Sequence, residues 1–369
     1  MNRLIRLYEE FDQSPWLDNL RRGYLTSGEL AKLRDDGIRG LTSNPTIFQK
    51  AIEGAADYDE QFRELALDDH PTTADYWAMV LQDIAGAADV LEPVYDESGG
   101  ADGFVSVEVD PGLAHDEAGT EAAARGLHEQ IARRNVMVKI PATAEGIGPI
   151  RTMIAEGRNT NVTLIFSLDR YRAVIDAYLD GLESYAAQDG TELGTVASVA
   201  SFFISRVDTE VDRRLEQIGT PEALALRGKA AIAQGKLAYK LFAEMFSGER
   251  WEALAERGAK VQRPLWASTS TKNEAYPDTM YVDNLIGPFT VNTMPDATIE
   301  AFNDHGTLAR TVDHHVDDAE AVWQSLADVG VDLDDVAAQL EREGVASFQK
   351  SFSSLIDALD AKIAELRAE

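Results

Sequence analysis

The sequence contains no cysteine and has far fewer basic than acidic residues, and each shortage excludes classes of function. Without cysteine there are no disulfide bonds, no thiol chemistry and no thiolate metal site. The 64 acidic residues outnumber the 34 basic ones and leave a formal net charge of -30. This charge argues against nucleic acid and anionic membranes as partners. An anionic substrate would therefore need a local pocket of basic residues.

Long apolar segments are missing as well. No run approaches the roughly 20 residues that a membrane-spanning helix requires. Residues 1–14 contain no apolar core of signal-peptide length. We therefore expect a cytoplasmic protein without a membrane partner, present as a monomer or a homodimer.

Motifs of cofactor-dependent and hydrolytic enzymes are missing too. The sequence has no glycine-rich nucleotide-binding fingerprint, no nucleophile elbow, and neither zinc-protease nor EF-hand spacing. His314 and His315 lie next to Asp313, Asp317 and Asp318, which resembles a metal cluster by composition only. We favour an acidic helix cap at this place and expect neither a metal nor a cofactor.

What the chain does have is a regular alternation of short apolar segments with amphipathic ones. Strands that alternate with helices favour a parallel sheet, and eight such strands favour a closed (β/α)8 barrel of the α/β class. The long connections 50–102 and 206–263 predict extra helices in loops, and residues 295–369 predict a helical C-terminal tail. No linker divides the chain, so we expect one barrel domain over residues 1–369. The predicted strands are Pro15–Asp18, Arg39–Ser43, Phe104–Val109, Val136–Ile140, Asn161–Phe166, Val196–Phe203, Pro264–Ser268 and Pro288–Asn292.

One predicted strand carries a lone amine. Strand alternation places Val136, Val138 and Ile140 on one face and Met137 and Lys139 on the other. If both faces are buried, an ammonium without a partner costs several kcal/mol and tends to lose its proton. A neutral buried amine can attack a carbonyl and form a Schiff base. The alternative is a lysine paired with a carboxylate in the core, and the other strands decide between the two.

The other strands place polar residues on the face that carries Lys139. In a barrel, residues of one parity point inward, and those near the C-terminal end of each strand line the active site. One buried Asn or Thr is usually a satisfied hydrogen bond. Polar residues at matching parity on every strand favour a catalytic cavity over a structural polar core. The residues assigned to this face are Trp16, Asp18, Thr42, Asn44, Ser106, Glu108, Asn161, Thr163, Ser201, Phe203, Trp266, Ser268 and Asn292.

These residues suit the steps that a Schiff-base lysine requires. Loss of water from the carbinolamine needs proton transfer, for which Glu108 and Thr163 could hold a water. Asp18 could serve as the base for cleavage of a C–C bond. Neutral donors and acceptors must orient the substrate hydroxyl groups, and Asn44, Asn161 and Ser201 suit that task.

Two cations follow strands where barrel loops often bind phosphate. Arg206 comes after the strand of Ser201, and Lys272 comes after Ser268. We favour a phosphate-binding role, and the alternative for each is a solvated surface cation.

Three segments resemble the motifs of one family. Leu41-Thr42-Ser43-Asn44-Pro45-Thr46 resembles the first motif of transaldolases, and Asn161-Val162-Thr163-Leu164-Ile165-Phe166-Ser167 resembles another. The segment Val136-Met137-Val138-Lys139-Ile140-Pro141-Ala142-Thr143 closely resembles the one that carries the Schiff-base lysine of that family. The resemblance runs in order over most of the chain and favours the longer actinobacterial and cyanobacterial type.

The resemblance implies a (β/α)8 barrel and a cofactor-free transferase of the pentose phosphate pathway. Such enzymes move a dihydroxyacetone unit from sedoheptulose 7-phosphate to glyceraldehyde 3-phosphate, which gives erythrose 4-phosphate and fructose 6-phosphate. Carried over by position, Lys139 forms the imine and Asp18 is the acid and base of C–C cleavage. Glu108 and Thr163 hold the water of imine formation. Asn44, Asn161 and Ser201 bind the dihydroxyacetone hydroxyl groups, and Arg206 binds the phosphate. We expect Thr42, Ser268 and Lys272 to bind substrate as well.

The chain departs from the common family pattern at two places. Ser201-Phe202-Phe203-Ile204-Ser205-Arg206 stands where a Ser-Pro-Phe-Val-Gly-Arg stretch is usual. Ser268-Thr269-Ser270-Thr271-Lys272-Asn273 stands where Ser-Phe-Arg is frequent, so Lys272 is the expected substitute for the second phosphate cation.

Two other functions are compatible with parts of this pattern. A fructose 6-phosphate aldolase of the same superfamily would release free dihydroxyacetone, but those chains are much shorter. A sugar-phosphate binding protein that has lost catalysis would be expected to lose Lys139, Asp18 or Glu108, and this chain keeps all three.

Overall fold

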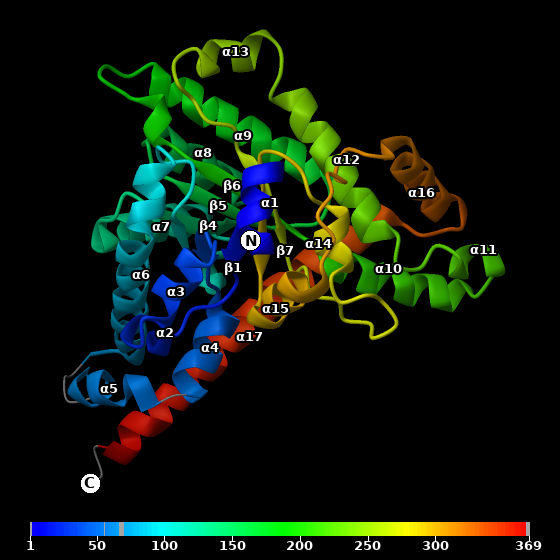
Figure 1. Ribbon diagram of the computed structural model, residues 1–369. Coiled ribbons are helices and arrows are strands. Elements are labelled where there is room, and N and C mark those ends of the chain that lie inside the picture. The colour runs from blue at the N-terminus through cyan, green and yellow to red at the C-terminus, as the bar shows by residue number, and fades with distance from the viewer. Residues whose placement is uncertain (1, 55, 66–69, 367–369) are drawn as a thin grey trace.

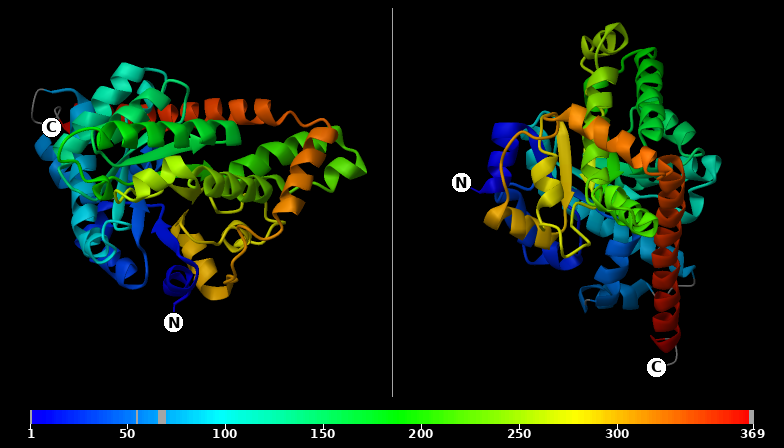
Figure 2. Two further views of the ribbon diagram at one scale, coloured as in Figure 1. Left: turned by 90° about the horizontal axis from the view of Figure 1, so that it is seen from above. Right: turned by 90° about the vertical axis from the view of Figure 1, so that its right-hand side faces the viewer.

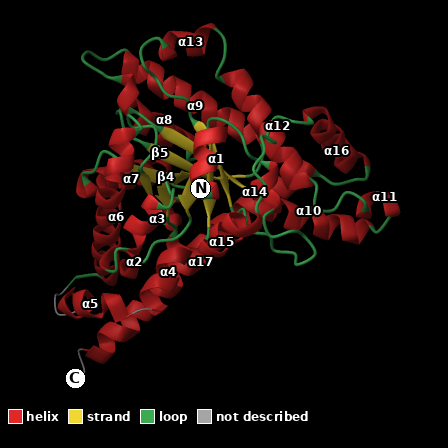
Figure 3. Ribbon diagram, in the orientation of Figure 1, coloured by secondary structure: helices red, strands yellow, loops and turns green. Residues whose placement is uncertain are grey.

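The computed structural model describes residues 2–54, 56–65 and 70–366. Eight parallel strands form a closed barrel in chain order, and β1 pairs with β8 to close it. Helices surround the barrel on its outside (Figures 1 and 3). The predicted (β/α)8 fold with extra helices and a helical C-terminal tail is confirmed.

Each predicted strand overlaps an observed one. The largest shift is at β8, where both ends lie two residues later than predicted, and Phe289, directly before the strand, has a left-handed backbone with φ of 58°. The strands are β1 Gln13–Leu17, β2 Gly40–Thr42, β3 Phe104–Glu108, β4 Val136–Pro141, β5 Thr160–Ile165, β6 Ser198–Phe203, β7 Arg263–Ala267 and β8 Thr290–Met294.

Helices occupy every connection between strands, with additional ones in the two long connections. The α-helices are α1 Arg3–Phe11, α2 Arg22–Thr26, α3 Glu29–Asp35, α4 Pro45–Gly54, α5 Asp59–Leu65, α6 Thr72–Glu97, α7 Glu117–Ile131, α8 Ile147–Ala155, α9 Leu168–Ala186, α10 Ile204–Ile218, α11 Pro221–Leu224, α12 Ala230–Met245, α13 Glu249–Ala255, α14 Met280–Asn284, α15 Asp296–His305, α16 Val316–Asp328 and α17 Leu333–Leu366. Short 3-10 helices span Ala56–Tyr58, Pro111–Leu113 and Leu193–Thr195. No helix of the described residues is long and apolar enough to cross a membrane.

Helix α9 illustrates how the sequence specifies these elements. The Ser167 side chain accepts a hydrogen bond from the N–H of Arg170, which caps the first turn. Tyr171, Val174 and Tyr178 follow at helical spacing and are fully buried. The ring of Tyr171 meets Phe202 of β6 edge-on, so this apolar stripe holds the helix against the barrel.

The acidic segment that resembled a metal cluster lies at the start of α16. Asp317 and Asp318 lie in the first turn of this helix, where negative charge is favourable, as the helix-cap prediction implies. The N-cap position itself is His315.

Trp266 of β7 and Asn292 of β8 were predicted to face inward, and both predictions were wrong, whereas Ser268 lines the cavity described below as predicted. Trp266 pairs in register with Asn292, and its indole N–H donates to the carbonyl of Leu285 among the outer helices. On β8 it is Thr293 that pairs with the inward-facing Trp16 and lines the cavity described below. Since Asn292 and Thr293 are adjacent and both polar, alternation alone could not select the inward residue.

Trp16 fills the barrel interior below the polar layer. Its indole ring lies where a Cβ on Gly40 of β2 would stand, with the nearest ring atom 2.3 Å from that position. The ring also lies 6.4 Å from that of Phe104. Gly40 is therefore required by the packing of the barrel floor.

The C-terminal helix α17 crosses the side of the barrel that carries the strand ends and runs next to α4 (Figures 1 and 2). The hydroxyl groups of Thr46 and Ser351 lie 2.8 Å apart and join the two helices. Gly344 allows α17 to approach β5 closely, because a Cβ there would stand 2.9 Å from the side chain of Leu164. The tail of the chain thus contributes to the region where the polar strand ends meet.

Candidate active site

A cavity of about 320 Å³ opens where the C-terminal ends of the strands meet. This is the end at which (β/α)8 barrels carry their active sites. Most of the predicted site residues line it together: Asp18, Thr42, Asn44, Lys139, Thr163, Ser201, Arg206, Ser268 and Lys272. Glu108 and Asn161 lie just behind this lining.

Lys139 projects from β4 and is 4% exposed. Its Nζ lies 3.1 Å from a carboxylate oxygen of Glu108 and donates to the carbonyl of Ser43 at 3.1 Å. Lys139 therefore has the buried carboxylate partner of the alternative prediction and also lines the cavity, and its role in a Schiff base stays a prediction.

Glu108 reaches Lys139 from the neighbouring strand β3, with which β4 pairs in register. Burial raises the pKa of the Glu108 carboxyl above its ordinary value, although the charge of Lys139 opposes this effect. A carboxyl group with a raised pKa can exchange a proton closer to neutral pH.

Asp18 lies just past the end of β1, on the far side of the cavity. Its carboxylate accepts a hydrogen bond from Thr42 at 2.7 Å, and the Thr42 hydroxyl lies 2.6 Å from that of Thr293. Burial raises the pKa of Asp18. The hydrogen bond from Thr42 and, to a smaller extent, the charge of Lys139 lower the pKa and oppose this effect. Asp18 is thus a second carboxyl group whose raised pKa suits proton transfer.

Asn44 caps α4 with one end of its amide group. Its Oδ1 accepts from the N–H of Ile47 at 3.0 Å, so the nitrogen end remains for a ligand in the cavity. A helix cap of this kind fixes the side chain in place.

Thr163 and Ser201 line the cavity from β5 and β6. The hydroxyl oxygen of Thr163 is buried and has no hydrogen-bond partner among the described residues. Ser201 donates to the Oδ1 of Asn161 at 2.7 Å, and the Nδ2 of Asn161 donates to Ser106 at 3.0 Å. Asn161 is fully buried, and its geometry orients Ser201 from below the lining.

The register of β5 is interrupted between Val162 and Ile165, where Leu164 has a φ of 60°. A residue other than glycine in the left-handed region is strained and persists only where the surroundings hold it. The irregularity directly follows Thr163 and ends the regular pairing at the cavity. Ser268, directly after β7, has a φ of 55°, and its hydroxyl lies 2.8 Å from that of Ser205.

Three cations surround the cavity: Arg206, Lys272 and Lys50. None of them forms an ion pair within the described part of the chain, although the chain has a net charge of -30. The Arg206 guanidinium lies over the rings of Phe203 and Phe348, at 5.0 and 5.9 Å from their centres. Burial lowers the pKa of Lys272, and the charge of Arg206 lowers it further. Cations that repel each other without carboxylate partners form a site for an anion.

The sequence interpretation missed Lys50 and the residues from α17. Lys50 follows Thr46 by one helical turn of α4, so helical periodicity after Asn44 could have placed both beside the cavity. Ser347 and Phe348 line the cavity from α17, and no local pattern connects them with strands so distant in the chain.

The geometry combines a buried amine, two carboxyl groups with raised pKa values, a row of neutral hydroxyl and amide groups, and a cationic rim. An amine in this setting can add to a carbonyl, and the carboxyl groups can move the protons of that addition.

Comparisons with known proteins agree with this chemistry. The model of the transaldolase/fructose-6-phosphate aldolase family matches residues 15–359. A transaldolase from Parafrankia sp. (strain EAN1pec) is 53% identical over 346 residues, which cover 93% of this chain and 94% of the relative. One from Thermobifida fusca (strain YX) is 52% identical over 351 residues, 95% of each chain. One from Acidothermus cellulolyticus is 50% identical over 358 residues, 96% of each chain.

Proposed function

This chain belongs to the transaldolase/fructose-6-phosphate aldolase family and has the transaldolase function of an aldehyde/ketone-residue transferase, and on that premise we propose which residues perform the reaction. The donor is sedoheptulose 7-phosphate and the acceptor is glyceraldehyde 3-phosphate. The products are erythrose 4-phosphate and fructose 6-phosphate. A cytoplasmic location belongs to the same proposal.

Lys139 is the nucleophile of this proposal. Its Nζ adds to the ketone carbon of the donor, and the resulting carbinolamine loses water to leave an iminium ion. Glu108 lies 3.1 Å from the amine and supplies the proton that the departing hydroxyl group requires. The unpaired hydroxyl of Thr163 supports its assignment as the partner of the water in this step.

Asp18 acts next as a base. It takes the proton of the hydroxyl group on the carbon beyond the bond to be broken. The C–C bond breaks, its electron pair passes to the iminium group as an enamine, and an aldose phosphate leaves. The enamine then adds to the aldehyde of the acceptor while Asp18 returns the proton. The raised pKa of Asp18 suits a group that is base and acid in turn.

Neutral side chains orient the dihydroxyacetone unit. The free amide nitrogen of Asn44 and the hydroxyl of Ser201 face the cavity, and Asn161 fixes Ser201 from beneath. Thr42 and Ser268 complete the polar wall. Because these groups are held by hydrogen bonds, little side-chain freedom is lost when the substrate binds.

Arg206, Lys272 and Lys50 bind the phosphate group in this proposal. The observation that carries it is their convergence on the cavity of Lys139 without carboxylate partners in the described part of the chain. A phosphate dianion placed there would relieve the repulsion among the three cations.

The first experiment measures glyceraldehyde 3-phosphate formed from fructose 6-phosphate, with and without erythrose 4-phosphate. We expect release only with the acceptor. Release without it, together with free dihydroxyacetone, would indicate the aldolase activity that the family name also covers. No release in either case would reject the proposal for these sugars.

A second experiment tests the nucleophile. Reduction with borohydride in the presence of fructose 6-phosphate should trap a covalent adduct on Lys139, detectable by peptide mass. Lys139→Ala should lose the adduct and at least about a thousandfold of activity, as nucleophile removal does elsewhere. The matched variant Lys32→Ala, at an exposed lysine of α3, should keep both. An adduct on another lysine would overturn the assignment.

A further inference from the structure

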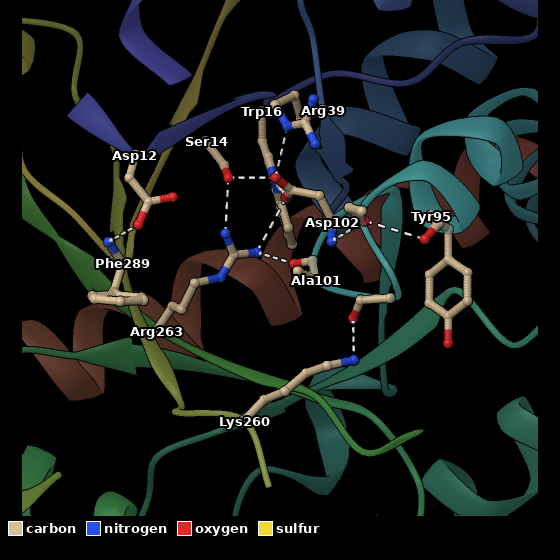
Figure 4. Close-up of polar contacts among 12 residues, drawn as sticks. Asp12, Ser14, Trp16, Arg39, Tyr95, Ala101, Asp102, Lys260, Arg263 and Phe289 are labelled. Carbon is tan, nitrogen blue, oxygen red and sulfur yellow. Dashed lines mark hydrogen bonds and ion pairs between the residues drawn. The ribbon is translucent and has the colours of Figure 1, made fainter. Parts of the chain in front are cut away.

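A second cavity, of about 290 Å³, lies at the opposite, N-terminal end of the barrel. It is bounded by the starts of several strands and by the loop between α13 and β7 (Figure 4). Its walls are mostly apolar and include Phe104, Met137, Trp251, Val261 and Phe289. No residue of the candidate active site lines it.

Lys260 projects at this cavity with its amine held in place. Its Nζ donates to the carbonyls of Gly99 and Gly100 at 3.1 and 2.7 Å, while its own carbonyl accepts from the Tyr178 hydroxyl at 2.7 Å. An ammonium has three donors, so one remains. Lys260 has no carboxylate partner within the described residues. Burial lowers the pKa of Lys260, and the charge of Arg263 lowers it further.

Arg263 adds a second positive charge to the same cavity. It donates to Ser14 at 2.8 Å and to the Ala101 carbonyl at 2.7 Å, and it pairs with Asp102 at 3.1 Å (Figure 4). Asp102 is shared with Arg39. Among the described residues that line the cavity, Lys260 and Arg263 are cations and none is a carboxylate. This is a local positive excess in a chain with a net charge of -30.

Phe289 presents its ring at the rim. Its side chain is 54% exposed although it is one of the largest apolar residues, and its backbone lies in the left-handed region with φ of 58°. The N–H of Phe289 donates to the Asp12 carboxylate at 3.2 Å, which holds this conformation (Figure 4). A strained backbone that exposes an aromatic ring beside an apolar cavity is a feature of ligand clamps.

We propose that this cavity binds a small amphiphilic carboxylate, with its apolar body against Phe289 and Trp251 and its carboxylate on Lys260. The apolar walls disfavour a sugar, and the unpaired ammonium favours an anion over a neutral ligand. The volume lies near the lower end of the roughly 300–1,000 Å³ typical of small-molecule sites. The ligand is therefore a short-chain or single-ring acid. The site is separate from the transferase cavity and extends beyond the function proposed above.

Titration calorimetry of the full chain with hydrocinnamate tests the proposal, with the neutral hydrocinnamamide as the matched ligand. We expect one hydrocinnamate to bind per chain. The amide should bind about tenfold more weakly, which is the usual effect of losing one charge-assisted hydrogen bond. Lys260→Met should reduce the affinity for hydrocinnamate to that for the amide, while Lys32→Met should leave both affinities unchanged. Phe289→Ala removes an exposed ring and should reduce the affinity for both ligands. This variant tests the site independently of the lysine.

Binding should persist in Lys139→Ala, and Lys260→Met should keep full transferase activity. Equal affinity for acid and amide would overturn the proposal, and so would unchanged binding in both variants. Absence of binding at millimolar hydrocinnamate would also overturn it. Sedimentation that shows a dimer dissociated by Phe289→Ala would identify a second copy of the chain as the occupant instead.

Discussion

At the scale of single residues, the proposed recognition of the substrate phosphate depends on three charged side chains. Most arginines pair with carboxylates, yet among the described residues Arg206, Lys272 and Lys50 have no such partners around one cavity. Carboxylates are abundant in the chain, so the lack of ion pairs to these three cations is a property of the site and not of the composition. The phosphate proposal depends on this contrast.

Lys50 gives the sharpest test at this scale. Lys50→Met keeps the length of the side chain and removes its charge. We expect KM for fructose 6-phosphate to rise about tenfold with little change in kcat, as for a contact made equally in ground and transition states. Arg206→Met should weaken the binding of the phosphosugar more strongly than the binding of unphosphorylated fructose. An equal effect on both sugars would remove the phosphate role of either residue.

At the scale of elements, long-range contacts between helices complete the site. The helix α17 brings Ser347 and Phe348 to the cavity, and Phe348 contacts Arg206. This approach depends on Gly344, where a Cβ would press on Leu164 and would stand 3.5 Å from the guanidinium of Arg206.

Gly344→Leu should therefore push α17 away from β5. We expect the free energy of unfolding to fall by about 1–3 kcal/mol through overpacking, and KM for the phosphosugar to rise. The control Gly126→Leu lies in α7, where an added Cβ would meet only Gln130, and should gain up to about 1 kcal/mol from helix propensity. Urea unfolding and steady-state kinetics measure both effects. Equal stability in the two variants would exclude the close-approach role of Gly344.

Asp208 joins three helices and makes their packing dependent on pH. From α10, it accepts from the N–H of Ala231 in α12 at 2.8 Å and from the hydroxyl of Tyr281 in α14 at 2.9 Å. Burial raises the pKa of Asp208 from 3.8 to about 6. The folded state therefore holds this proton more tightly than the unfolded state, so the contribution of Asp208 to stability falls as pH rises from about 4 to about 6.

Asp208→Asn removes this titration. The free energy of unfolding of the variant, relative to the natural chain, should increase by about 2–3 kcal/mol between pH 4 and pH 7. Urea unfolding across this range measures the difference. Asp189→Asn, at an exposed position, serves as the control and should show no such trend. A constant difference between Asp208→Asn and the natural chain would contradict the assignment.

At the scale of the whole molecule, one buried carboxylate helps to close the barrel. Asp102 precedes β3 and is 1% exposed. It accepts from Ser14 and from Trp16 of β1 at 2.5 and 2.9 Å, and it pairs with Arg39 beside β2 and Arg263 of β7. Burial by itself would raise the pKa of the Asp102 carboxyl. The positive charges of Arg263 and then Arg39 outweigh this effect and hold the pKa below its ordinary range. The first, second and seventh strands thus meet at one charge.

Asp102→Asn keeps the size of the side chain and leaves the two arginines without their shared partner. We expect the free energy of unfolding to fall by about 3–5 kcal/mol, because buried cations lose their counter-charge. The kcat of the folded enzyme should remain close to that of the natural chain, since Asp102 lies at the end of the barrel away from Lys139. Denaturant unfolding and kinetics on the same preparation measure the two quantities. A large loss of kcat at unchanged stability would contradict this role.

Much of the site was predictable because strand alternation is a local property. Lys139, Asp18 and Thr163 lie where their strand parity predicts, and each lines the cavity. Glu108 and Asn161 point inward as predicted but lie behind the residues that line the cavity. Strand parity does not predict this, because it depends on which side chains from other strands lie between these residues and the cavity. Parity failed at β8, where two adjacent polar residues made the pattern ambiguous.

The sequence by itself determined the order of strands and helices, the buried amine in β4 and the chemical class of the site. Hydrophobic periodicity and motif spacing depend on neighbours along the chain, which the sequence states directly. Only the tertiary structure decided that Lys50 and α17 line the cavity of Lys139, that Asp102 holds three strands together, and that Lys260 and Phe289 border a second cavity. These contacts join segments far apart in the chain, and closure of the barrel alone brings them within reach of each other.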